Sequence, residues 1–200
     1  MKSLNKFMAA LLLSSIFIQP SHSAEVMGIK VDDTAKVGTH NLKLNGAGIR
    51  YKAIFKVYVA ALYLNENKST TAEVLALGGA KRVALTVQRD LSSEELGRRF
   101  MDGMKQNADV TERAKLVGAM LSFGQMFSAI PEMKKGDVLT VDLIPGTGTV
   151  SQLNGKKVGD TIPDPNFYNA LLKIWLGPQP VDGKLKRELL GEKPAETNTQ

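Results

Sequence analysis

The stretch GAGIRYKAIFKVYVAALYL, from Gly46 to Leu64, constrains the fold more than any other part of the chain. Its odd positions are apolar or aromatic throughout, whereas its even positions carry Arg50, Lys52 and Lys56, followed by Tyr58, Ala60 and Leu62. A period of two is typical of a β-strand and predicts one face against a core and one at least partly polar face. Arg50 is then either a solvent-facing side chain or the polar group of a ligand pocket.

The N-terminal segment has the three-part pattern of a secretory signal peptide. Lys2 and Lys6 precede an apolar run over residues 7–18, and Pro20 and small residues follow. The run is shorter than the roughly 18 apolar residues that a membrane-spanning helix needs. We therefore expect cleavage before Ala24 and a periplasmic or secreted protein, with no later stretch able to span a bilayer.

Composition excludes several classes of site. The chain has no cysteine, so neither a disulfide nor a lipid-modified cysteine can form. Once the signal peptide is removed, His40 is the only histidine, so the usual zinc sites cannot be assembled and a Ser-His-Asp triad could use only His40. The formal charge falls from +6 to +4 with the loss of Lys2 and Lys6, and the remaining basic residues are mixed with acidic ones. This pattern indicates solvated helix faces rather than a nucleic-acid surface, and no metal or cofactor is expected.

The order of periodicities predicts an α+β fold. Strands come first, up to Leu64, and a strand of period two also covers residues 81–91. Two amphipathic helices follow, then strands that include a hairpin turn at Asn154-Gly155, then two further helices. The helices are expected over residues 69–77, 92–107, 111–127, 164–175 and 182–190. Because strands and helices do not alternate strictly, an antiparallel sheet with helices on one face is favoured over a parallel sheet.

Three segments resemble the chalcone isomerase-like superfamily in the same order: LNGAGIRYKAIFKVYVAALYL, VALTVQRDLSSEELGRRFMDGM and LLKIWLGPQPVDGKLKRELLG. The resemblance implies an open-faced β-sandwich, in which a large antiparallel sheet is covered on one face by helices, with a ligand cleft between them. Together with the N-terminal pattern and the polar sequence after Gly191, it divides the chain into a signal peptide over residues 1–23, a domain over 24–191 and a disordered tail over 192–200.

The resemblance also divides the candidate functions. Some members are intramolecular lyases that cyclise chalcones, and others are non-catalytic fatty-acid binders that hold a carboxylate with an Arg and a Tyr. Arg50 matches the cleft Arg of both branches, and Tyr58 matches the fatty-acid binders where the enzymes have a Thr. Leu96, Gly103 and Ile174 stand where the enzymes carry Tyr, Asn and Ser or Thr. Arg50 and Tyr58 are therefore the predicted ligand-binding residues, and no catalytic residue is expected.

The loss of these hydrogen-bonding groups predicts an apolar cleft around one guanidinium, suited to a small amphipathic ligand such as a fatty acid. Two alternatives stay open: an intramolecular lyase or isomerase, which needs a second polar group beside Arg50, and an interaction module with a solidly packed cleft. One difficulty concerns Tyr58, because eight residues of uninterrupted strand would place it about 26 Å from Arg50 at ~3.3 Å per residue. The two can share a ligand only if the chain reverses or bulges near Lys52-Ala53.

Overall fold

The computed structural model describes residues 23–26, 28–130 and 132–192. A seven-stranded sheet forms the centre, with strand order β11-β10-β9-β6-β5-β4-β3 and every neighbouring pair antiparallel. The predicted signal peptide, up to residue 22, and the predicted tail after Glu192 lie outside the described residues. The strands of this sheet are β3 (Thr34–Val37), β4 (His40–Lys52), β5 (Phe55–Leu64), β6 (Lys81–Val87), β9 (Val138–Ile144), β10 (Gly148–Leu153) and β11 (Lys156–Ile162).

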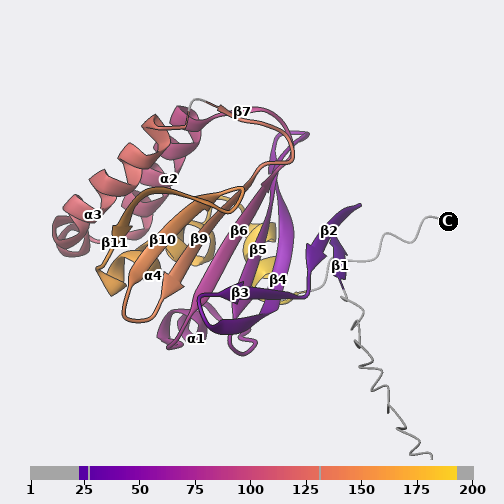
Figure 1. The fold of residues 1–200 in the computed structure, drawn as a ribbon, viewed down its shortest axis with the longest axis horizontal. Helices are drawn as coiled ribbons and strands as arrows, with labels where there is room; N and C mark the ends of the chain where they lie inside the picture. Colours follow the sequence, from indigo (N-terminus) through magenta and orange to yellow (C-terminus); the bar gives the residue numbers. More distant parts are fainter. Residues whose placement is uncertain (1–22, 27, 131, 193–200) are drawn as a thin grey trace, which may run out of the picture.

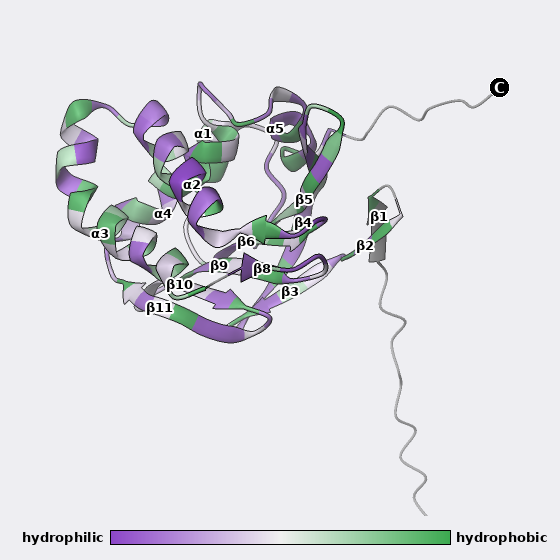
Figure 2. Cartoon of the chain, turned by 90° about the horizontal axis from the view of Figure 1, so that it is seen from above, coloured by the Kyte–Doolittle hydropathy of each residue, from purple (hydrophilic) through white to green (hydrophobic). Residues whose placement is uncertain are grey.

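Two small antiparallel pairs accompany the large sheet. Strands β1 (Ser23–Val26) and β2 (Ile29–Asp32) form one pair, and β7 (Leu91–Ser92) and β8 (Glu132–Met133) form the other. The helices form a second layer, and Figure 2 shows this layer on one side of the sheet. They are α1 (Thr71–Ala76), α2 (Ser93–Asn107), α3 (Val110–Ser128), α4 (Pro165–Leu176) and α5 (Gly183–Leu189). The predicted α+β architecture, with helices over one face of a large antiparallel sheet, is confirmed (Figure 1).

The helices begin where their sequence signals predict. The side chain of Ser92 accepts the N–H of Glu95 at the start of α2, and Asp164 precedes Pro165 at the start of α4. These residues satisfy N–H groups that have no partner within the helix. On α2 the buried stripe is Leu96, Phe100 and Met104, as the spacing of four predicts.

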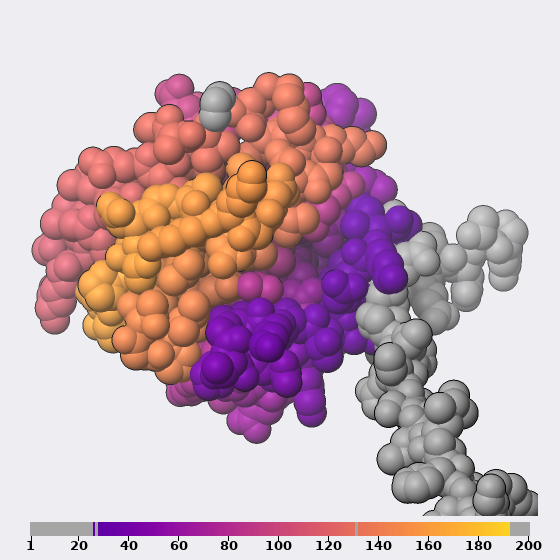
Figure 3. Space-filling view, in the orientation of Figure 1, coloured from indigo at the N-terminus to yellow at the C-terminus, as the bar shows by residue number. Residues whose placement is uncertain are grey.

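The main core lies between the sheet and the helices. Its aromatic centre is Phe100, Phe123, Phe127 and Trp175, in which Phe100 meets both Phe127 and Trp175 edge to face, with ring centroids 5.6 and 5.4 Å apart. A second, smaller cluster lies on the opposite face of the sheet and includes Ile49. Figure 3 looks onto this second face, part of which the indigo N-terminal strands cover.

The stretch from Gly46 to Leu64 is two strands rather than one. Strand β4 ends at Lys52 and β5 begins at Phe55, so the chain reverses at Ala53 and Ile54. Ala53 has a φ of 53°, a left-handed conformation that non-glycine residues rarely adopt. The expected polar face does not extend through β5, because both faces of this strand are buried from Tyr58 onward.

Helix α5 covers the even positions of β4 at very close range. A Cβ added at Gly46 would lie 2.1 Å from the carbonyl oxygen of Glu188, and one at Gly48 would lie 2.0 Å from Oε2 of the same residue. Only glycine allows the backbone of α5 this close to the strand. Gly46 and Gly48 therefore allow α5 to pack directly against β4.

Candidate functional site

The β4–β5 hairpin brings the two predicted ligand-binding residues together. Arg50 and Tyr58 are directly opposite each other in the strand register, so the separation of about 26 Å expected for one long strand does not apply. The register shifts between Arg50 and Tyr51, which leaves Val57 as a bulged residue without a partner. Because directly opposed residues share one face of a sheet, Arg50 and Tyr58 point to the same side.

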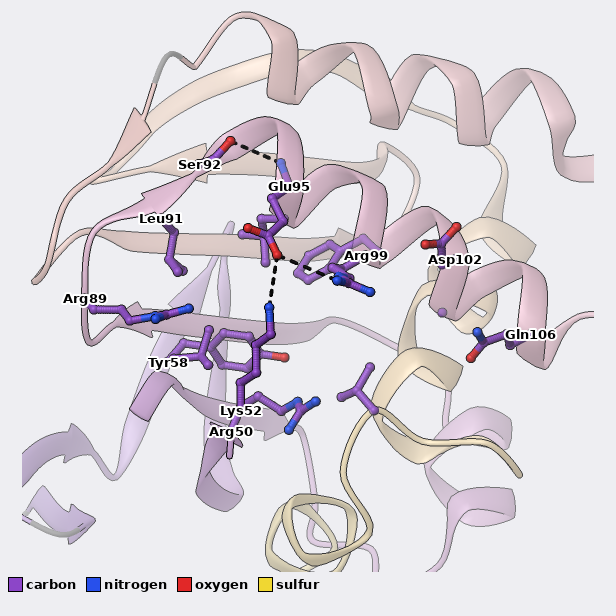
Figure 4. A pocket seen from close by; sticks show the side chains of 15 residues that line it. Arg50, Lys52, Tyr58, Arg89, Leu91, Ser92, Glu95, Arg99, Asp102 and Gln106 are labelled. Atoms are coloured by element: carbon purple, nitrogen blue, oxygen red, sulfur yellow. Dashed lines mark hydrogen bonds and ion pairs between the residues drawn. The ribbon is translucent and has the colours of Figure 1, made fainter. Parts of the chain in front are cut away.

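A cavity of about 320 Å³ lies at this end of the hairpin, between the sheet and α2 (Figure 4). Its walls come from the hairpin, from the segment that joins β6 to α2, from α2 itself and from Val181 ahead of α5. Both Arg50 and Tyr58 line it. The lining residues are Arg50, Lys52, Val57, Tyr58, Arg89, Leu91, Ser92, Glu95, Leu96, Arg99, Phe100, Asp102, Gly103, Gln106 and Val181.

Tyr58 lies deep in the wall of the cavity. Its exposed fraction is 4%, and its hydroxyl oxygen accepts a hydrogen bond of 3.1 Å from Nε1 of Trp175. Burial raises the pKa of the Tyr58 phenol to about 12, so the hydroxyl keeps its proton at physiological pH. Within the described residues the Tyr58 hydroxyl donates no hydrogen bond, so its proton is available for an acceptor placed in the cavity.

Arg50 has a partner that the sequence did not indicate. Its Nη1 donates to the backbone oxygen of Tyr51 and to Oδ2 of Asp182, the latter at 3.3 Å. The side chains of Arg50 and Asp182 are 27% and 18% exposed. Oδ1 of Asp182 caps α5 by accepting from the N–H groups of Lys184 and Leu185. One carboxylate thus holds both the guanidinium and the start of the helix, while the other nitrogens of Arg50 make no hydrogen bond to the described residues.

Charged side chains surround the mouth of the cavity. Lys52 Nζ lies 3.3 Å from Oε1 of Glu95, and Arg99 Nη2 lies 3.7 Å from the same oxygen. Figure 4 shows this chain of contacts across the opening. Arg89 lines the cavity as well, and its Nε is buried without a hydrogen-bond partner among the described residues.

The prediction of a single guanidinium in the cleft is therefore wrong. Four cationic side chains line the cavity, Arg50, Lys52, Arg89 and Arg99, against two carboxylates, Glu95 and Asp102. The larger part of the lining surface is nevertheless apolar, as expected, with Val57, Leu91, Leu96, Phe100 and Val181 among the lining residues. Sequence reasoning missed Arg89 because it ends a predicted strand, where a charged residue is ordinarily solvated.

Leu96, Gly103 and Ile174, the positions where the family resemblance implies polar residues in the chalcone-cyclising enzymes, lie on the α2 side of the cavity or beneath it. Leu96 and Gly103 both line it from α2. Ile174 is fully buried beneath, where a Cβ added at Gly103 would lie 3.2 Å from its Cγ2. The remaining histidine, His40, begins β4 and pairs with Val37, at the end of the strand away from Arg50.

The described residues contain neither a candidate metal centre nor a candidate membrane-spanning helix. No group of three or more acidic, histidine or cysteine side chains in the described part is arranged to hold a metal ion. None of the helices in that part is long and apolar enough to cross a membrane.

Comparison with known proteins agrees with this architecture. No curated protein matches the sequence. The structure is similar to the crystal structure of a fatty-acid binding protein of Arabidopsis thaliana, with a TM-score of 0.66 and 14% identity, over 82% of this chain and 92% of that one. At this identity the likeness concerns the fold. A family model described as chalcone isomerase-like matches residues 23–191. The chain therefore belongs to the chalcone isomerase-like family.

Proposed function

We propose that this protein binds a small amphipathic carboxylate, such as a fatty acid, in the cavity between the β4–β5 hairpin and α2, without catalysing a reaction. The observation that carries the proposal is the pairing of Arg50 and Tyr58 across the hairpin, both lining the cavity and both with unused N–H or O–H groups. A carboxylate accepts hydrogen bonds and carries the opposite charge, so it suits this pair.

The form of the cavity supports a ligand of modest size. Its volume of about 320 Å³ lies near the lower end of the range of about 300–1,000 Å³ that is typical of small-molecule sites. Below Tyr58 the aromatic core is closed, because Trp175 and Phe100 pack edge to face with centroids 5.4 Å apart. The carboxylate would lie at Arg50, and the apolar part of the ligand would contact Val57, Leu96 and Phe100. The fatty-acid binding protein of similar fold is consistent with this class of ligand.

An intramolecular lyase is the second candidate, because the cavity does contain polar groups beside Arg50. Chalcone cyclisation needs a phenolate held for attack and donors for the enolate that forms. Tyr58 could supply one donor, but Leu96 and Gly103 supply none from the side that α2 contributes. We therefore propose that chalcone absorbance will decay in the presence of the protein no faster than in buffer. A decay that Arg50→Ala abolishes would establish the lyase instead.

Titration with a fluorescent fatty acid at fixed salt tests the binding proposal. We expect Arg50→Ala to weaken binding by tenfold or more, because hydrogen bonds to charged groups are worth about 1.5–3 kcal/mol. Arg50→Lys should restore only part of the affinity, since an ammonium cannot form the planar bidentate pair. Arg98→Ala is the matched control, because Arg98 is exposed on α2 and does not line the cavity. Equal affinities in all four proteins would remove Arg50 from the site.

We also propose that the protein is exported, on the basis of its N-terminal sequence pattern. Intact-mass measurement of the protein recovered from the periplasm or the medium should show a chain that begins near Ala24. A full-length mass in that fraction would contradict the proposal.

A further inference from the structure

Two large apolar side chains are exposed at the tip of the β4–β5 hairpin. Ile54 is 84% exposed and Phe55 is 56% exposed. Exposed apolar side chains that occur singly are ordinary, but adjacent ones beside a ligand cavity are typical of an interaction surface. Hairpin turns usually carry Gly, Asn or Asp, so neither the turn geometry nor a buried contact accounts for this Ile-Phe pair.

The tip lies at the mouth of the cavity. Phe55 is directly opposite Lys52 in the strand register, so the two side chains share a face, and Lys52 lines the cavity. Arg89, another lining residue, places its guanidinium carbon 5.7 Å from the centroid of the Phe55 ring. The exposed apolar tip and the cavity opening are therefore continuous, with Arg89 between them.

The surroundings of the tip are cationic. Lys56 follows Phe55, and the segment that carries Lys135 is held against Asp90 by a hydrogen bond from the backbone N–H of Lys135 to Oδ1 of Asp90, 2.9 Å long. Within the described part of the chain, Lys56, Arg89 and Lys135 form no salt bridge with a carboxylate. Among the described residues, Lys56 and Arg89 therefore adjoin the two exposed apolar side chains without a carboxylate in a salt bridge, and Lys135 lies on the neighbouring segment beside Asp90.

We propose that the tip, defined here as Ile54 and Phe55 with the cations Lys56, Arg89 and Lys135, docks on the surface of an anionic phospholipid bilayer. Apolar side chains inserted at the lipid interface and basic side chains at the headgroups are the two contributions that hold peripheral proteins to membranes. This inference rests on the proposed function, because a carrier of fatty acids would exchange them most directly where its cavity meets the bilayer. Charge complementarity favours an anionic bilayer over an apolar protein surface.

The absence of cysteine makes a site-specific test possible, since one introduced cysteine is the only labelling site. Ile54→Cys carries a nitrobenzoxadiazole dye, whose emission rises and shifts to the blue when it leaves water. Leu121→Cys carries the same dye as the matched control, because Leu121 is also apolar and 60% exposed but lies on α3. Each labelled protein, without fatty acid, is mixed with phosphatidylcholine vesicles that contain or lack phosphatidylglycerol.

We expect the emission change at position 54, only with phosphatidylglycerol, and not at position 121. The apparent affinity should fall steeply as ionic strength rises from about 0.1 M to about 1 M, which shortens the screening length from about 10 to about 3 Å. Lys56→Glu in the Ile54→Cys background should weaken vesicle binding by fivefold or more, from about 1 kcal/mol for each cation near the surface. Phe55→Ser in that background should weaken binding at all salt concentrations.

Three results would overturn the proposal: no emission change at position 54, an equal change at both positions, or a change at position 54 that depends on protein concentration without vesicles. The last would indicate a second copy of the chain as the partner. Because the vesicle assay uses ligand-free protein, it remains informative if Arg50→Ala leaves fatty-acid affinity unchanged. The membrane proposal and the ligand proposal can therefore fail separately.

Discussion

Replacement of Asp182 by Asn is expected to tighten binding of a carboxylate ligand. Asp182 occupies Nη1 of Arg50 at 3.3 Å and so competes with the ligand for the guanidinium. Asn is as good as Asp at the N-cap position, immediately before the first residue of a helix, so α5 should keep its cap. The substitution thus removes the negative charge that contacts the Arg50 guanidinium, with little change in local structure.

The size of the effect follows from the geometry of one guanidinium between two carboxylates. Acceptors on opposite edges of the same guanidinium are roughly 6–7 Å apart, where two like charges repel by about 0.6 kcal/mol in bulk water and about 2.5 kcal/mol at an effective dielectric constant of 20. Arg50 and Asp182 are both partly exposed, so the lower half of this range applies. We expect affinity for a fluorescent fatty acid to rise by about threefold to tenfold.

The assay is the same titration at low, fixed salt, with Asp164→Asn as the control. Asp164 caps α4 as Asp182 caps α5, but it lies outside the cavity. Asp164→Asn should therefore leave affinity unchanged. If Asp182→Asn leaves affinity unchanged or weakens it while circular dichroism shows the helices intact, Arg50 does not contact the ligand carboxylate.

Two further predictions concern the contact between α5 and β4. Gly46→Ala should lower the free energy of unfolding in urea by about 1–3 kcal/mol or more, since its Cβ would meet the backbone of Glu188, whereas Gly118→Ala, with open space around it on α3, should not destabilise. Burial raises the pKa of the Glu188 carboxyl above its ordinary value, so the stabilisation from its protonated form is lost as pH rises through that pKa. Glu188→Gln should therefore raise the melting temperature relative to wild type at pH 7 and lose this advantage near pH 4. A difference in melting temperature that instead grows toward acid pH would contradict burial as the cause of the raised pKa.

The elements set by local signals could be predicted from the sequence. The positions of the helices follow from the spacing of their apolar residues and from their N-cap residues, such as Ser92 and Asp164. The turn at Asn154-Gly155 follows because Asn and Gly accept the positive φ angles that both residues adopt, 51° and 76°. These signals lie within a few residues of the structure they determine.

The alternation of side chains does not reveal the β4–β5 hairpin, because a turn and a bulge have opposite effects on the alternation and cancel each other. A two-residue turn at Ala53 and Ile54 reverses the parity of positions that share a face, as the pairing of Lys52 with Phe55 shows. The bulge at Val57 reverses it again. The stretch therefore alternates as one continuous strand would, and Ala53 offers no turn signal.

The charged side chains around the cavity could not be predicted from the sequence either. Arg50 and Asp182 are 132 residues apart, and nothing local to either one indicates their contact. Arg89 and Glu95 each look like solvated residues, at the end of a strand and on the first turn of a helix. Only the packing of α2 and α5 against the hairpin places these charges around one cavity.

The dependence of Arg50 on Asp182 also sets the order in which the protein can mature. At about 5–20 residues per second, the 132 residues between them take roughly 7–26 seconds to synthesise. During that interval Arg50 has been synthesised but Asp182 has not, so the guanidinium lacks its carboxylate partner. Gly46 and Gly48 also lack α5, the helix that packs against them. A nascent chain therefore lacks the Arg50–Asp182 contact until late in synthesis, and completion of the cavity coincides with arrival of α5.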